Sequence, residues 1–303
     1  MKEPKWHSDR RLVENLPLRY RAYAAYSRAF ASAGSRRVPG GSALLRLLRR
    51  TGGESVVKIR ANDDDTLLAD FSDDRILEVL HEIRRENPEF AVLSALLNEG
   101  STFIDVGANY GTFSVIASRL AGASGRVIAI EPQPRLAGFI AESARESGID
   151  NIEVIEAAAG AAHGRATLLV PAGDTGRAGL MARFSGRGRH DAVDVKVIPL
   201  DDLEPKVTPL SRVVMKIDVE GSEMNVLEGG RKLIASTQPT LIIELNPWSA
   251  DASGNTVDDL LVALEDLGYS WFSLARDFPR SLRHREIPRS TQENLVAAFE
   301  KPS

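Results

Sequence analysis

The chain contains no cysteine among its 303 residues. It can therefore form no disulfide, offer no thiolate nucleophile and build no zinc–thiolate site. Its five histidines are scattered along the sequence, without the His-x-x-x-His spacing that places two ligands on one helix face. We therefore expect no histidine- or cysteine-bound metal.

Long apolar runs are also missing. Nowhere do about 18 apolar residues follow one another, as a membrane-spanning helix requires. The N-terminal segment has charges but not the apolar stretch of roughly 7 to 15 residues that follows them in a secretory signal. We expect a protein without a transmembrane segment, located in the cytoplasm.

The charge is nearly balanced, with 38 Lys+Arg against 42 Asp+Glu and a formal net charge of -4. Residues 1–60 hold 14 of the basic and 4 of the acidic residues, which leaves 24 and 38 for the remainder. The basic excess is thus confined to the N-terminus. We interpret residues 1–53 as a helical basic extension and residues 54–303 as the main domain, with strand and helix elements in 54–100 and the core in 101–303.

Short β-rich runs alternate with apolar helical stretches through most of the main domain. This alternation is typical of a parallel sheet covered by helices. One pair of runs breaks it by flanking a Gly- and Arg-rich loop, 171–190, and we interpret that pair as an inserted hairpin. Strands are predicted at 56–60, 66–70, 102–106, 127–130, 152–156, 165–170, 193–198, 213–217, 240–245, 269–274 and 294–300, and helices at 74–84, 89–97, 112–120, 135–147, 223–233 and 257–267.

A glycine-containing loop follows the strand predicted at 102–106. Asp105 ends that strand, and Gly107, Ala108, Asn109 and Gly111 lead into the next helix. Glycines at this position let backbone approach a ligand at a helix N-terminus. The loop lacks the third glycine of a dinucleotide fingerprint, and a carboxylate would repel a pyrophosphate. It would suit an ammonium group, such as that of the methionine moiety of S-adenosylmethionine.

Acidic residues end the next two strands as well. Glu131 follows the strand at 127–130, twenty residues after Gly111, where a carboxylate can accept both hydroxyl protons of a ribose. Glu156 and Ala157 follow the third strand, where they could meet an adenine. Together these positions predict a nucleoside-binding site, although a surface role for Glu156 stays open.

A second group of charged residues surrounds the end of the strand at 213–217. Strand alternation places Lys216, Asp218 and Glu220 on one side. A central parallel strand is normally apolar on both faces, so a buried Lys and Asp there need a reason. Glu244 ends the following strand and should open onto the same crevice, because ligands of open α/β sheets bind at the carboxyl ends of the strands.

Residues 103–111 and 215–223 resemble the two hallmark motifs of the FkbM-type family of S-adenosylmethionine-dependent methyltransferases. The resemblance extends over about residues 56–300. It implies an α/β, Rossmann-like class I methyltransferase fold, with a seven-stranded, mostly parallel sheet whose last strand is antiparallel. Tyr110 stands where many members have an aliphatic residue, which should change packing near the methionine and leave the chemistry intact.

The resemblance also implies O-methylation of a sugar or polyketide-like small molecule, with S-adenosylhomocysteine as product. We expect Asp218 to act as general base or orienting acceptor and Lys216 to balance its charge. Glu220 and Glu244 would bind acceptor hydroxyls. A Mg²⁺ ion held by the three acids, whose oxygen ligands would suit it, is an alternative that we do not favour.

Other functions compete with this interpretation. RNA ribose 2'-O-methylation would use the basic extension for phosphate contacts, but the main domain is acidic, which disfavours nucleic acid as a partner. A non-catalytic cofactor-binding scaffold is a second alternative, since fold does not fix function. The missing third glycine argues against an NAD-dependent oxidoreductase. Homo-oligomerisation stays open.

Overall fold

The computed structural model describes residues 20–21, 47, 55–61, 64–83, 87–179, 190–207 and 211–302. The helices predicted in the extension fall outside these ranges apart from three helical residues. One of them, Tyr20, is buried and stacks on Phe71 with the ring centroids 4.0 Å apart. The extension therefore contacts the main domain at this point. Within the described residues, no helix has the length and apolar character needed to cross a bilayer.

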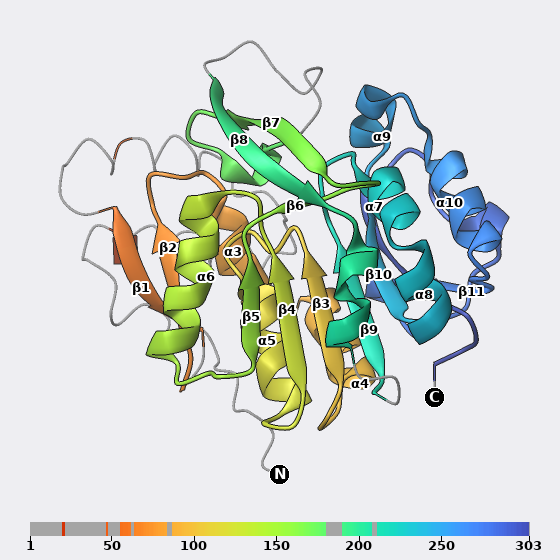
Figure 1. The fold of residues 1–303 in the computed structure, drawn as a ribbon, viewed down its shortest axis with the longest axis horizontal. Coiled ribbons are helices and arrows are strands. Elements are labelled where there is room, and N and C mark those ends of the chain that lie inside the picture. The colour runs from red at the N-terminus through yellow and green to blue at the C-terminus, as the bar shows by residue number, and fades with distance from the viewer. Residues whose placement is uncertain are drawn as a thin grey trace.

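A seven-stranded sheet forms the centre of the molecule (Figure 1), in the order β11-β12-β10-β9-β3-β4-β5. Its strands are β3 (Thr102–Val106), β4 (Arg126–Ile130), β5 (Ile152–Ile155), β9 (Val213–Ile217), β10 (Thr240–Leu245), β11 (Trp271–Leu274) and β12 (Glu293–Ala298). Strand β12 runs antiparallel to both of its neighbours, β10 and β11, while β3, β4, β5, β9 and β10 pair in parallel. This confirms the predicted Rossmann-like fold.

Helices cover both faces of the sheet because its central strands are apolar on both sides. The helices are α3 (Ile76–Glu82), α4 (Pro88–Leu96), α5 (Thr112–Ala121), α6 (Pro134–Glu146), α7 (Glu223–Gly229), α8 (Arg231–Thr237), α9 (Pro247–Ser253) and α10 (Val257–Asp266). In β3, Phe103 packs in the core under α3–α5, whereas Ile104 packs in the core under α7, α8 and α10. The two cores thus lie on opposite faces of the sheet. Because the central strands are parallel, their carboxyl ends lie together at one edge of the sheet.

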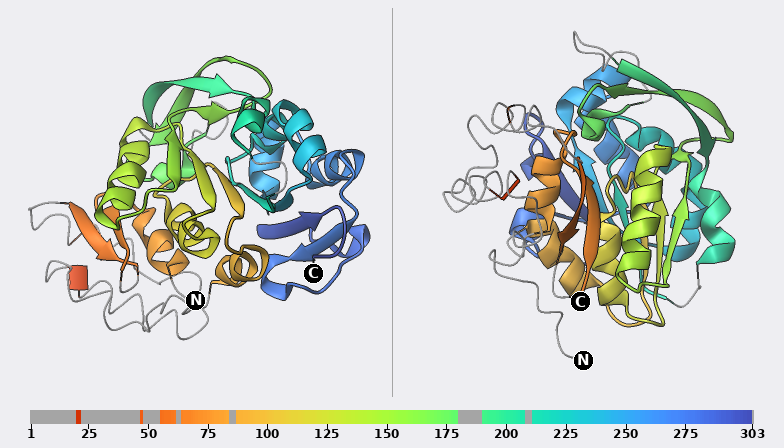
Figure 2. Two further views of the ribbon diagram at one scale, coloured as in Figure 1. Left: turned by 60° about the horizontal axis from the view of Figure 1, so that its bottom comes forward. Right: turned by 90° about the vertical axis from the view of Figure 1, so that its left-hand side faces the viewer.

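An N-terminal hairpin, β1 (Val56–Arg60) and β2 (Thr66–Asp70), lies outside the main sheet. Helix α6 contacts both β2 and β5 and lies between the hairpin and the sheet (Figure 2). Ser143 of α6 and Ser147, which follows its last residue, accept hydrogen bonds from the backbone of β2: Ser147 Oγ from Thr66 N and Ser143 Oγ from Leu68 N, both at 2.9 Å. Side chains of a helix thus satisfy the donors of an edge strand.

The predicted inserted hairpin is present as β7 (Gly164–Pro171) and β8 (His190–Ile198), which pair antiparallel. They are longer than predicted, so the loop between them is shorter. A two-residue strand, β6 (Ala158–Ala159), pairs with β8 and was not predicted. The three strands form a separate sheet above the carboxyl edge of the main sheet (Figure 1). Of the loop predicted at 171–190, residues 180–189 lie outside the described residues.

The prediction of a single helix at 223–233 is wrong. The segment is divided into α7 and α8 at Gly230. A Cβ on Gly229 would lie 2.0 Å from the carbonyl oxygen of Gly160. The end of α7 therefore approaches the chain after β6 so closely that only glycine fits at position 229. Helix α9 and the 3₁₀ segment Leu200–Lys206 were not predicted.

Candidate active site

The glycine-containing loop connects β3 to α5 in a conformation that its sequence requires. Gly107 and Gly111 have φ of +82° and +76°, and Asn109 has φ of +53°. A Cβ on Gly107 would lie 2.0 Å from the carbonyl oxygen of Asp218. The loop therefore meets the end of β9 at backbone distance, which only glycine permits. The backbone amides of Gly107 and Ala108 both donate to the carbonyl of Ile130, at 2.9 and 3.0 Å.

Asp105 is buried at the end of β3, with 1% of the residue exposed. Its Oδ2 accepts a hydrogen bond from the Ser114 hydroxyl at 2.6 Å, whereas its Oδ1 has no hydrogen-bond partner among the described residues. Burial raises the pKa of Asp105 to about 6, against the opposing effect of Lys216. A buried oxygen without a donor is what a ligand ammonium group would satisfy.

Glu131 is also buried, at the end of β4. Its Oε2 accepts from Asn109 N at 2.8 Å and its Oε1 from Gln133 N at 2.9 Å. Burial raises its pKa to about 7, although these backbone donors favour the ionised form. The carboxylate thus holds the glycine loop in place, and each oxygen keeps a further lone pair for a ligand hydroxyl. This anchoring role was not predicted from the sequence.

The third predicted nucleoside contact lies at the end of β5. Glu156 is exposed there, and Ala157 is buried, donating its amide to the carbonyl of Ile155 at 3.0 Å. The two residues thus lie at the same carboxyl edge as Asp105 and Glu131, one strand further out.

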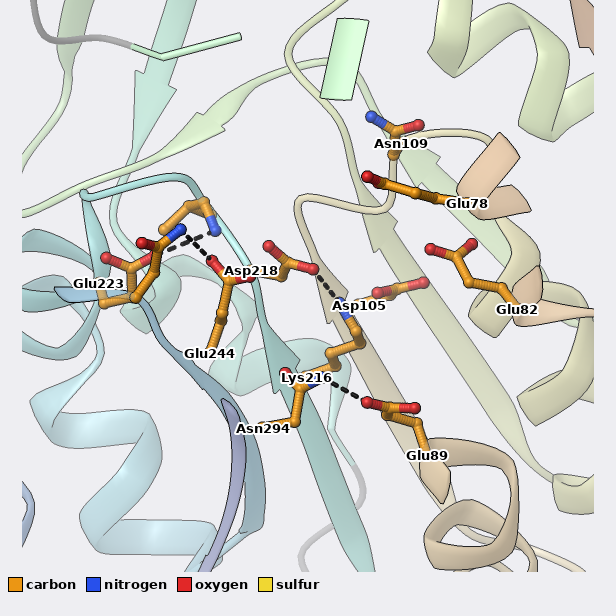
Figure 3. Close-up of polar contacts among 12 residues, drawn as sticks. Glu78, Glu82, Glu89, Asp105, Asn109, Lys216, Asp218, Glu223, Glu244 and Asn294 are labelled. Carbon is orange, nitrogen blue, oxygen red and sulfur yellow. Dashed lines mark hydrogen bonds and ion pairs between the residues drawn. The ribbon is translucent and has the colours of Figure 1, made fainter. Parts of the chain in front are cut away.

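Lys216 and Asp218 form an ion pair of 2.6 Å at the end of β9 (Figure 3). The Lys216 side chain is only 5% exposed, and its Nζ lies 5.0 Å from the centroid of the Phe113 ring. Burial opposes ionisation of Asp218, but Lys216 and Arg75 hold its pKa below the ordinary value. Strand alternation had predicted that both side chains point to one side. Asp218 N also donates to the Val106 carbonyl at 3.0 Å, which joins the two motifs.

Glu220 and Glu244 complete an acidic group with Asp218, since one oxygen of each lies within 4.8 Å of the others. Glu244 accepts hydrogen bonds from Gln292 and, at 3.4 Å, from Asn246, and Glu220 accepts one from Ser249 at 3.4 Å. Burial and the neighbouring carboxylates raise the pKa of Glu244 to about 8 and that of Glu220 well above its ordinary value. Oxygen ligands in such a group are those that Mg²⁺ accepts.

Helix α3 supplies charged residues that sequence analysis missed. Arg75 forms ion pairs with Glu78 and Glu82, and it acts electrostatically on Asp218. Figure 3 shows Glu78 beside Asn109 and Glu82 on the side of Asp105. The ion pairs of Arg75 are local, but its effect on Asp218 joins segments far apart in the chain, and a charged helix face carries no local signal for it.

The Methyltransferase FkbM domain matches residues 105–271, more than half of the chain. The chain belongs to the FkbM methyltransferase family. This confirms the family predicted from the two motifs, and both motifs border the site just described.

Solved structures show more distant similarity. The chain is 21% identical to the methyltransferase FkbM from Methylobacillus flagellatus KT, with a TM-score of 0.43 over 76% of this chain and 56% of that one. It is 16% identical to an S-adenosylmethionine-dependent methyltransferase from Aquifex aeolicus, with a TM-score of 0.42 over 75% and 94% of the two chains. The chain thus spans little more than half the length of the Methylobacillus protein. No curated protein matches it.

Membership of the FkbM family makes S-adenosylmethionine the cofactor, and the residues present fit it. The partnerless Oδ1 of Asp105 can accept from the amino group of the methionine moiety. Glu131 retains acceptor capacity for ribose hydroxyls, because each of its oxygens accepts only one hydrogen bond from the backbone. When bound, the cofactor supplies an electrophilic methyl group on a sulfonium.

Proposed function

We propose that this protein is an O-methyltransferase that methylates a hydroxyl group of a sugar or polyketide-like small molecule. The observation that supports it is the ion pair between the buried Lys216 and the half-buried Asp218, which lies against the glycine loop. A lysine and a carboxylate at the carboxyl end of a central strand are suited to hold a hydroxyl beside the bound methyl donor.

The pKa shifts of the acids indicate which of them orients the acceptor hydroxyl and which takes up its proton. Asp218 stays ionised beside Lys216 and Arg75, so it can accept a hydrogen bond from the acceptor hydroxyl and orient its oxygen. A carboxylate with a lowered pKa is a weak base, however. Glu220 and Glu244 have raised pKa values, so the ionised form of either is a stronger base than Asp218, and we assign the proton released during transfer to a carboxylate oxygen of whichever of the two is ionised.

The charge around the site favours a neutral or cationic acceptor. Among the described residues, the cations beside it are Lys216 and Arg75, each already engaged with carboxylates. The acids outnumber them and include Asp105, Asp218, Glu220, Glu223, Glu244, Glu78 and Glu82. A phosphate group would be repelled here, so RNA methylation has less support than methylation of an uncharged hydroxyl compound.

Titration calorimetry tests the cofactor site. We expect heat of binding from S-adenosylmethionine and none from NAD, and weaker binding by Glu131→Ala, because Asn109 loses its anchor and the ribose its acceptor. Binding of NAD alone, or of neither compound, would contradict the proposal. Methyl transfer to panels of sugars and polyketide-like alcohols would then identify the acceptor.

Asp218→Asn tests the acceptor side of the site. We expect it to retain cofactor binding and to lower kcat by about 10²- to 10⁴-fold, because the amide cannot hold the same hydrogen bond or charge balance. Asp266→Asn, at the exposed end of α10, makes the same chemical change away from the site and should leave kcat unchanged. Wild-type turnover by Asp218→Asn would refute the assigned role.

A further inference from the structure

Three segments far apart in the chain meet at the carboxylate of Asp73. This residue precedes α3 and is 2% exposed. Its Oδ2 accepts from the Tyr110 hydroxyl at 2.8 Å and from the Thr175 hydroxyl, and its Oδ1 accepts from the amides of Thr175 and Arg75, both at 3.0 Å. One buried carboxylate therefore holds the glycine loop, the segment before α3 and the chain that leaves β7.

The chain that leaves β7, residues 173–177, is held on two sides, and we call it the strap. On one side, Asp74 N donates to the Gly173 carbonyl at 2.7 Å, and a Cβ on Gly176 would lie 2.4 Å from Cδ of Arg75. On the other side, Gln133 Nε2 donates to the Thr175 carbonyl at 3.3 Å. The strap thus spans from α3 to the residues that follow the cofactor-binding strand β4.

Tyr110 connects this arrangement to the cofactor loop. It is 1% exposed, lies between Asn109 and Gly111, both with positive φ, and stacks on Phe139 with the ring centroids 5.9 Å apart. Burial and Asp73 raise its pKa, so the hydroxyl remains a donor. An aliphatic side chain could pack here but could not make this bond. The hydroxyl therefore does more than fill space.

We propose that Asp73 is a positioning residue that ties the cofactor loop, through Tyr110, to the strap, through Thr175. Placement of the inserted hairpin and binding of S-adenosylmethionine are then coupled. The inference rests on the cofactor site proposed above for residues 105–111.

A comparison of Tyr110→Phe with Tyr269→Phe tests the connection between the cofactor loop and Asp73. Both tyrosines are buried, and the Tyr269 hydroxyl donates to the Pro239 carbonyl at 3.0 Å, away from the loop. Each variant loses one buried hydroxyl, so both should lose thermal stability. Only Tyr110→Phe should weaken S-adenosylmethionine binding in calorimetry, by about tenfold, since it loses a hydrogen bond to a charged group. Equal cofactor affinity in the two variants would overturn the proposal.

The strap side is tested by Thr175→Val, which removes the other hydroxyl bonded to Asp73. We expect weaker cofactor binding from this variant alone and little further loss when it is combined with Tyr110→Phe, because both changes break one connection. Fully additive effects, or none from Thr175→Val, would refute the coupling.

Amide hydrogen exchange without cofactor gives a readout that does not depend on the proposed function. In Tyr110→Phe the strap amides, including Thr175 N, should exchange faster than in Tyr269→Phe. Unchanged exchange would contradict the link. If the wild type bound no S-adenosylmethionine, the proposed function would fail, and the exchange result would still decide whether Asp73 joins the two segments.

Discussion

Gly107 is the residue on which the meeting of the two motifs depends most directly. Gly107→Ala should place a methyl group against the Asp218 carbonyl at a positive φ, which costs about 1–2 kcal/mol for the backbone conformation alone and more for the overlap. We expect a total loss above about 3 kcal/mol in chemical denaturation, together with loss of cofactor binding.

Gly148 provides the matched control for that substitution. It also has a positive φ, +59°, but an added Cβ would have nothing within 4 Å. Gly148→Ala should therefore show the backbone cost alone, about 1 kcal/mol, with unchanged cofactor affinity. Similar losses in the two variants would mean that the close approach to Asp218 contributes nothing.

The positions of individual side chains were predictable where the pattern is local. The pairing of Lys216 with Asp218 follows from alternation along one strand, and the buried Asp105 from its place at a strand end. The anchoring of Asn109 by Glu131 was not predictable, because it depends on how two loops lie relative to each other. The same holds for Arg75, which acts on Asp218 across 143 positions of the chain, a separation that no local pattern records.

At the scale of elements, Ser143 of α6 and Ser147 just after it hold the edge strand β2. Ser143→Ala should leave the amide of Leu68 without its acceptor and cost about 1–3 kcal/mol in the free energy of unfolding. Ser236→Ala removes an exposed hydroxyl of α8 and should change stability by less than about 0.5 kcal/mol. Denaturant unfolding of both variants is the measurement, and equal stability would show that β2 finds another acceptor.

The strands of the central sheet were the most predictable elements. The predicted bounds of β3, β9 and β10 agree with the structure, because each is a short apolar run between turn residues. The division of α7 from α8 was not predictable, since it follows from the contact of Gly229 with Gly160 in another part of the fold. Strand β6 has two residues and no periodicity to detect.

At the scale of the whole molecule, the buried acids make stability depend on pH. Glu244 has a pKa of about 8 in the folded chain and an ordinary value of 4.5. Between these values the folded state binds the proton more tightly than the unfolded state, so stability falls as pH rises. Glu244→Gln removes this titration. Relative to wild type, it should gain on the order of 2 kcal/mol between pH 5 and pH 8.

Thermal unfolding at several pH values measures this effect. Glu204→Gln makes the same change at an exposed position in the segment after β8 and should follow the wild-type pH dependence. Parallel curves for Glu244→Gln and wild type would show that Glu244 is ionised in the folded protein throughout this range.

The inserted strands pair among themselves and add no strand to the seven-stranded sheet. Changes in β7 and β8 that keep residues 173–177, which are bonded to Asp73, therefore leave the register of the donor-binding strands unaltered. The inserted sheet lies above the carboxyl edge of the main sheet (Figure 1), so evolution or a protein engineer can exchange its strands as a unit. Chimeras carrying a relative's hairpin strands, joined at β6 and after β8 with residues 173–177 retained, would be a route to new acceptors on a retained methyl-donor site.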